Sequence, residues 1–191
     1  MSRIINAVIF AVTLALVARA FYRDGRWALD NGRKAFRFFT VQSNAFCAVA
    51  ALMVCLAPGQ RWAWLMKYVG TAAVTVTMLT VFVFLGPSMG GVGELLRGGD
   101  LFMHLLTPLM AILSFALFER RGMGFATALW GLLPVTLYGL WYLYKIIYAP
   151  EDRRWEDFYG FNRGGRWPVA FAAMMLGAFA ICMALMALQN L

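Results

Sequence analysis

Apolar residues run along this chain in long blocks that short polar and glycine-rich stretches separate. A helix that crosses a bilayer needs about 20 predominantly apolar residues, and six blocks reach roughly that length. They cover residues 4–22, 38–57, 65–85, 101–118, 125–148 and 168–188. We therefore predict an all-α, polytopic integral membrane protein, a six-transmembrane-helix bundle. Little sequence remains outside the blocks, so residues 1–191 are expected to form a single transmembrane domain.

The composition narrows the class further. The chain is 62% hydrophobic and 14% charged, whereas a soluble domain averages about 45–50% apolar and about 25% charged residues. These values exclude an ordinary soluble globule and a disordered chain. The net charge of +8 comes from basic residues in loops beside the apolar blocks, where they orient the protein and meet anionic lipid. The expected partner is the lipid bilayer, and no nucleic acid is expected.

The first apolar block and the charges of the loops indicate how many times the chain crosses the membrane and which side each loop faces. Arg3, an apolar stretch and Ala18-Arg19-Ala20 have the features of a signal peptide, but the block is long enough to span and a membrane bundle follows it. We therefore count it as a span. The first, third and fifth loops carry most of the Lys and Arg, so the positive-inside rule predicts that these loops are cytoplasmic and that both termini lie outside.

Metal and organic cofactors are not expected. The cysteines Cys47, Cys55 and Cys182 lie inside predicted helices, and no CxxC motif is present. Neither a disulfide framework nor a zinc site follows from that arrangement. His104 is the only histidine, which excludes a paired-histidine metal or haem site.

Polar residues inside the blocks share helical faces. A polar side chain in a membrane helix is costly, so its position is informative. Residues spaced i, i+3, i+4 and i+7 lie on one face of a helix. The second span follows this spacing, and the third, fourth and fifth carry polar residues as well. The sets are Thr40, Ser43, Asn44 and Cys47; Thr77 and Thr80; Asp100, His104, Thr107 and Ser114; and Tyr138, Trp141, Tyr142 and Lys145.

The span count predicts where these faces meet. Thr40 and His104 each lie a few residues from loops on the same side of the membrane, which at 1.5 Å per residue places both roughly 5 Å inside the boundary. Tyr142 and Lys145 approach that boundary as well. Pro108 cannot donate to the carbonyl of His104 and is expected to bend the helix beside it. We expect one polar site near one membrane face.

A hydroxyl beside a lone histidine favours nucleophilic catalysis. His104 would take the proton of Thr40, whose oxygen would attack an ester carbonyl to form an acyl-enzyme that water then hydrolyses. Nearby polar groups would stabilise the oxyanion or orient these two residues. The candidate oxyanion or orienting residues are Gln42, Ser43, Asn44 and Asp100. Asp100 either orients the imidazole or only caps its helix.

A lipid ester would reach such a site laterally, with its acyl chains among the apolar helices and any free carboxylate at the interface. Cationic and polar residues near that interface are candidates for holding it. The candidate substrate-binding residues are Arg37, Tyr142, Lys145, Asn162 and Arg163. Ordinary membrane anchoring is the alternative role for the basic residues among them.

Two short motifs carry a resemblance to a known family. Residues Phe38-Phe39-Thr40-Val41-Gln42-Ser43-Asn44 resemble the FFTxQSN element of small bacterial membrane proteins that are distantly similar to the animal androgen-induced membrane proteins. His104 and Pro108 resemble that family's H-x-x-x-P element in a later span. Residues 157–168 depart from the W-Y-P-Y-P-F-L-D-like element that many relatives have there.

The resemblance implies a fold, an activity and a location. The animal relatives are threonine hydrolases that cleave fatty acid esters of hydroxy fatty acids, and their catalytic threonine and histidine would correspond to Thr40 and His104. The resemblance thus implies that this protein is an intramembrane hydrolase of lipid (fatty-acyl) esters in the bacterial inner (cytoplasmic) membrane, with a lipid ester as substrate.

Two other functions remain open. A small transporter or channel with a proton-coupled polar cavity would also have convergent polar faces, and a polar path to the opposite membrane face would favour it. A transport site is expected near the midplane, whereas the polar residues here cluster near one face. A non-catalytic assembly protein would use Thr40 and His104 only to hold helices together.

Overall fold

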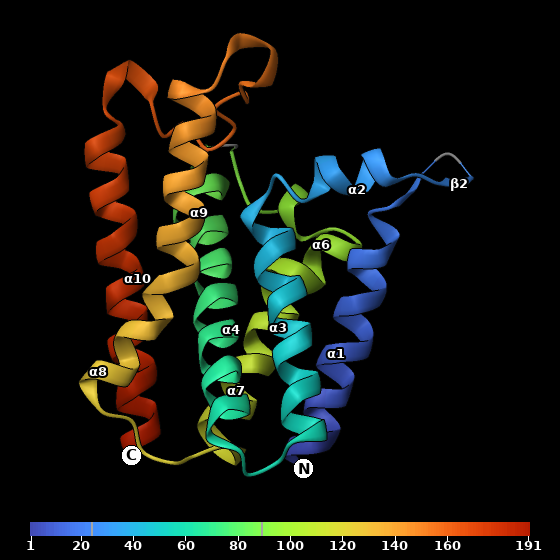
Figure 1. Ribbon diagram of the computed structural model, residues 1–191, viewed down its shortest axis with the longest axis vertical. Coiled ribbons are helices and arrows are strands. Elements are labelled where there is room, and N and C mark those ends of the chain that lie inside the picture. Colours follow the sequence, from blue (N-terminus) through green and yellow to red (C-terminus); the bar gives the residue numbers. More distant parts are fainter. Residues whose placement is uncertain (24, 89) are drawn as a thin grey trace.

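A computed structural model describes residues 1–23, 25–88 and 90–191 of the chain as a bundle of long helices (Figure 1). Within these residues, six helical segments are long and apolar enough to cross a membrane, which confirms the predicted fold class and indicates an integral membrane protein. The segments are α1 (Ser2–Arg19), α3 (Phe39–Leu56), α4 with the π-helix η1 (Arg61–Leu79, Thr80–Leu85), α6 with η3 and α7 (Gly99–Leu101, Phe102–Leu106, Thr107–Phe118), α8 with η4, α9 and η5 (Phe125–Ala128, Leu129–Leu132, Leu133–Leu143, Tyr144–Tyr148), and α10 (Trp167–Asn190).

Short elements join the spans. Both termini lie at one end of the bundle, and the two-stranded hairpin with α2 projects at the other end (Figure 1). Tyr22 pairs with Trp27 in the hairpin. The short elements are β1 (Tyr22–Arg23), β2 (Arg26–Trp27), α2 (Leu29–Ala35), α5 (Gly86–Ser88), η2 (Glu94–Leu96), η6 (Glu151–Arg153) and η7 (Arg163–Gly165). We call the end that carries the hairpin the hairpin end, and the other the terminal end.

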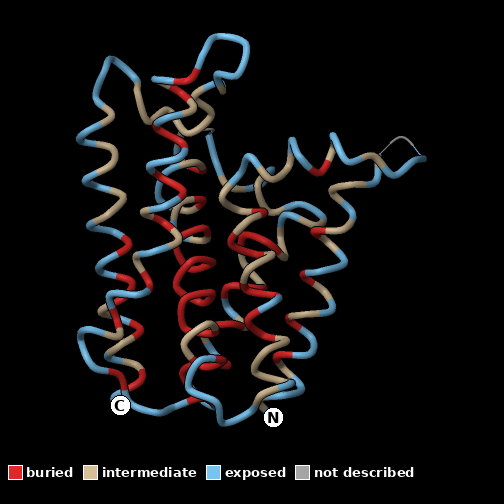
Figure 2. The backbone as a smooth tube through the Cα atoms, in the orientation of Figure 1, coloured by how far each residue is buried: buried red, intermediate tan, exposed pale blue. Residues whose placement is uncertain are grey.

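Helix α4 forms the centre of the bundle. Figure 2 shows buried positions concentrated along it. In its most apolar window 61% of the residues are buried, against 22% for both α1 and α10. It contacts α3, α7, α9 and α10, so the outer helices turn most of their surface toward lipid. Gly70 permits the close approach to α3, since a Cβ there would lie 3.2 Å from the Cα of Cys47.

Three spans change from α- to π-helical geometry, all toward the hairpin end. η1 follows α4, η3 precedes α7, and η5 follows α9. In η3 the cause is local, because Pro108 lacks the N–H that would bond the carbonyl of His104. The irregularity expected beside His104 therefore takes the form of a widened turn. π-Helical turns occur frequently at functional sites.

Candidate functional site

Thr40 lines a cavity of about 380 Å³ that lies between α3, α4 with η1, α9 and α10. Most of its lining is apolar, with Val76, Val135 and Ala173 among the residues that form it. Its lining residues with hydroxyl groups are Thr40, Thr77, Thr80, Tyr138, Tyr142 and Tyr159. A mainly apolar cavity with a few hydroxyls suits an acyl chain that carries one ester group.

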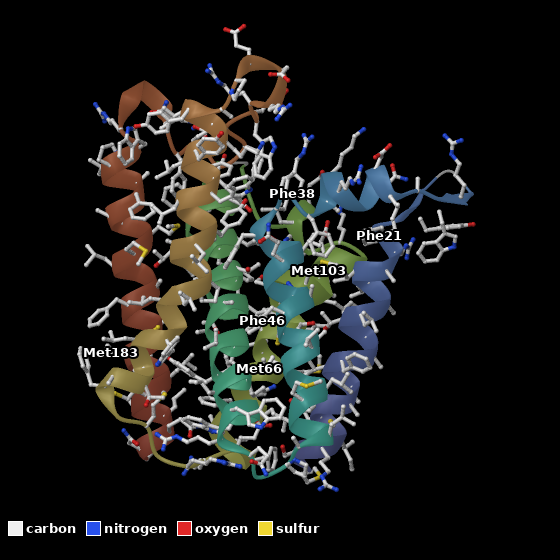
Figure 3. All side chains as sticks on the ribbon, viewed as in Figure 1. Phe21, Phe38, Phe46, Met66, Met103 and Met183 are labelled. Carbon is white, nitrogen blue, oxygen red and sulfur yellow. The ribbon has the colours of Figure 1, made fainter. Side chains whose placement is uncertain are left out.

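Asn44 joins the segments that carry Thr40 and His104. Its amide nitrogen donates to the carbonyl of Thr40 at 2.8 Å and to the carbonyl of Met103 at 3.1 Å, and its side chain is fully buried. These two bonds use both N–H groups of the amide. Asn44 can therefore orient the two segments, but it has no donor left for an oxyanion. Phe38 and Met103, neighbours of the two site residues, appear at the same end of the bundle in Figure 3.

The imidazole of His104 is held by a backbone carbonyl. Its Nδ1 lies 2.6 Å from the carbonyl oxygen of Leu95, in η2. A carbonyl only accepts, so Nδ1 carries the proton, and in neutral imidazole Nε2 keeps the lone pair that a general base needs. Asp100 does not take this orienting position, because its side chain is exposed. It does not cap the helix either, since the N-cap of α6 is Gly98.

The structure brings Thr40 and His104 to the same end of the bundle without bonding them to each other. Among the described residues no hydrogen bond joins their side chains, and His104 does not line the cavity. Ser43 bonds Thr77 at 2.8 Å and the carbonyl of Thr40 at 3.1 Å. Gln42 donates to the carbonyl of Phe36 at 2.7 Å and so secures the turn before α3.

The loop between α9 and α10 closes over the start of α3. The hydroxyl of Tyr159 accepts from the N–H of Phe39 at 3.1 Å, and the hydroxyl of Tyr138 donates to the carbonyl of Arg37 at 2.7 Å. Burial raises the pKa of Tyr159, and the hydrogen bond from the N–H of Phe39 opposes that shift. The phenol therefore remains neutral and keeps its proton. With the bonds of Asn44 and Ser43, these contacts join polar residues of α3, α4 and α9. The polar face of the fourth span does not join them as predicted, because Thr107 bonds Thr13 of α1 and Ser114 bonds Glu119.

Asp157 organises the same loop. Its carboxylate accepts from the hydroxyl of Tyr142 at 2.9 Å and from the backbone N–H groups of Phe161 and Asn162 at 2.8 and 2.7 Å. Tyr142 thus supports the loop while lining the cavity. Asn162 lies in this turn, and its side-chain oxygen is buried without a hydrogen-bond partner in the described part of the chain.

Of the three basic candidates for substrate binding, only Arg37 and Lys145 lie close to each other. Arg37 and Lys145 both lie over the ring of Trp155, at 5.8 and 5.6 Å from its centroid, which places two cations at the edge of the loop. Lys145 also donates to the carbonyl of Arg153 at 3.3 Å. Arg163 is exposed in η7. Arg37 and Lys145 are therefore the pair best placed to meet a carboxylate at the interface.

A second polar cluster, which sequence reasoning missed, lies at the terminal end. The carboxylate of Glu119 is buried, and one of its oxygens accepts from Ser2, Asn6 and Ser114. The carbonyl of the same residue accepts from the indole of Trp64 at 2.8 Å. Glu119 follows the fourth span directly and looks like an ordinary turn residue in the sequence, so its burial is a result of tertiary packing.

Lys67 extends this cluster into the bundle. Its side chain is fully buried, and its ammonium group has no hydrogen-bond partner among the described residues. An ionisable residue within a span is a signal that the sequence does contain. An apolar cluster of Ile9, Cys47, Ala51, Val74 and Ala111 also packs inside the bundle. Along α4, the buried residues Thr71 and Thr75 lie between Lys67 and Thr77.

Comparisons with known proteins add no relative. No family model, no curated protein and no solved structure matches this chain. The resemblance drawn from the two short motifs therefore stays a prediction. The fold and the geometry of the two polar ends are the observations on which a function has to be argued.

Proposed function

We propose that this protein is an intramembrane threonine hydrolase that cleaves lipid (fatty-acyl) esters, with Thr40 as nucleophile and His104 as general base. The observation that carries the proposal is the position of Thr40 on the wall of a mainly apolar cavity, one helical turn from the amide that ties it to the His104 segment. An acyl chain in that cavity would bring its ester group to Thr40, whose backbone carbonyl Asn44 holds.

The reaction uses groups already described. Nε2 of His104 takes the Thr40 proton as the hydroxyl oxygen attacks the ester carbonyl. The bond to the leaving alcohol then breaks, and the alcohol oxygen receives that proton. Water, activated by the same nitrogen, hydrolyses the acyl-threonine to a fatty acid and free Thr40. The neutral phenol of Tyr159, which lines the cavity, is our candidate donor to the oxyanion.

The geometry sets one condition on this mechanism. Since Thr40 and His104 are not bonded to each other, the ester must draw them together or a water must carry the proton between them. Catalytic hydrogen bonds are often long in unliganded enzymes and shorten when substrate binds. The π-helical turn of η3, next to the Asn44 bond, is where a small shift of His104 would occur.

An assay of purified protein against a panel of fatty-acyl esters tests the proposal. Thr40→Val and His104→Ala should abolish turnover, because each removes a group that the covalent step needs. Thr80→Val is the matched control, since Thr80 lines the same cavity and has no step assigned. Wild-type turnover in both site variants would reject the mechanism.

Proton-coupled transport is the second candidate, and the Glu119–Lys67 cluster is the observation that favours it. Buried ionisable residues within spans commonly mark ion or proton paths. On α4 the buried residues Thr71 and Thr75 lie between Lys67 and Thr77, so a proton path toward the Thr40 end would run along these hydroxyls. Proton flux into liposomes that is lost in Glu119→Gln would favour transport over hydrolysis.

A further inference from the structure

A second cavity opens at the terminal end, far from Thr40. Its volume is about 370 Å³, and it lies between the start of α1, the turn that joins α3 to α4, and the turn that follows α7. Ser2, Trp64 and Glu119 line it together with three arginines, Arg3, Arg120 and Arg121. The hydrolase proposal uses none of these residues.

The three arginines are free to bind an anion. Their side chains are exposed, and none forms an ion pair with a carboxylate in the part of the chain that the structure describes. Arg120 donates to the carbonyl of Ala116, and Arg121 donates to the carbonyl of Gly59 at 2.8 Å. Each of these bonds fixes a guanidinium but uses only one of its five N–H donors.

The surrounding charge favours an anion with a single phosphate. Three arginines and one carboxylate, that of Glu119, line the cavity, and one oxygen of that carboxylate already accepts from three donors. Guanidinium groups bind phosphate oxygens in a bidentate manner. The carboxylate lies on the cavity wall and repels an anion that enters deeply, so the phosphate would stay at the arginine rim.

We propose that this cavity binds the phosphate of an anionic phospholipid headgroup. The cavity lies at the ends of the spans, where lipid headgroups meet the protein, and this position favours a lipid over a soluble phosphate ester. The inference does not depend on the hydrolase proposal, because it concerns the opposite end of the bundle.

Thermal unfolding in a neutral detergent tests the inference, with the midpoint followed as ligand is added. The probes are dioleoyl phosphatidylglycerol, dioleoyl phosphatidylcholine and glycerol 3-phosphate. We expect phosphatidylglycerol to raise the midpoint most. The triple variant with Arg3→Gln, Arg120→Gln and Arg121→Gln should bind it at least about tenfold more weakly, because charge-assisted bonds are lost.

The matched control is the triple variant with Arg26→Gln, Arg33→Gln and Arg154→Gln. It removes the same charge at the hairpin end and should respond like the wild type. If the first triple variant does not fold, Arg3→Gln alone serves, and it should show part of the loss. Equal loss in both triple variants, or an equal response to phosphatidylcholine, would overturn the inference. A response to glycerol 3-phosphate as strong as that to phosphatidylglycerol would reject the lipid as the source.

Discussion

Asn44→Leu is the substitution that most directly probes how the bundle aligns its two proposed catalytic residues. It keeps a side chain of similar size but removes the bonds to the Thr40 and Met103 carbonyls. A net hydrogen bond contributes about 0.5–1.5 kcal/mol, and interhelical bonds in membrane proteins average about 0.6 kcal/mol. The amide oxygen of Asn44 is buried without a partner, so its removal offsets part of the loss. We therefore expect the free energy of unfolding to fall by about 1 kcal/mol.

The effect on turnover should be larger than the effect on stability. Without the bridge the Thr40 and His104 segments move independently, and misplacement by about 1 Å can lower a rate about a hundredfold. Unfolding in mixed micelles and ester hydrolysis would be measured on the same samples. Thr75→Val is the control, because in the described part of the chain it loses a bond only within its own span, to the carbonyl of Thr71 at 2.7 Å. An Asn44→Leu protein with full turnover would refute the reasoning.

Four further substitutions test the packing. Lys67→Met removes a buried ammonium group that has no hydrogen-bond partner among the described residues, so the unfolding midpoint in micelles should rise, and a fall would contradict that burial. Glu119→Gln replaces charge-assisted bonds from Ser2, Asn6 and Ser114 with neutral ones and should lower the free energy of unfolding by about 1–3 kcal/mol; an unchanged midpoint would argue against those bonds. Gly131→Ala should lower the free energy of unfolding by about 1–3 kcal/mol, because its Cβ would lie 2.7 Å from the thiol of Cys182 and from the phenol oxygen of Tyr68. Gly177→Ala is the control, since its Cβ would meet nothing within 4 Å. Equal effects of the two substitutions on the unfolding midpoint would exclude the close contact at Gly131. Tyr159→Phe removes the oxygen that accepts from the N–H of Phe39 at the start of α3, so hydrogen exchange of the Phe39 amide should accelerate. An unchanged exchange rate would argue against this hydrogen bond.

The spans were predictable because bilayer thickness fixes helix length and composition marks the blocks. Their ends were not. α4 begins at Arg61, four residues before the apolar block, because an arginine at a helix end can extend its charge to the interface. α1 ends at Arg19, and Tyr22 belongs to a hairpin that hydrophobicity alone does not reveal.

The position of Thr40 and His104 at the same end of the bundle was predictable, because it follows from counting spans. The hydrogen-bond partner of His104, the carbonyl of Leu95 in η2, was not predictable, because a backbone carbonyl can belong to any type of residue. The burial of Glu119 depends on donors from two other helices, Asn6 of α1 and Trp64 of α4 among them. Contacts of this kind are set by tertiary packing, which local pattern does not specify.

Covalent labelling of Thr40 tests the central claim most directly. Purified protein would be treated with a fluorophosphonate or an activated fatty-acyl ester, and the modified residue would be identified by mass spectrometry of its peptides. The account predicts a label on Thr40, absent in Thr40→Val, strongly reduced in His104→Ala and retained in Thr80→Val. A folded wild-type protein that hydrolyses esters while Thr40 stays unlabelled, or a label that His104→Ala leaves unchanged, would contradict it.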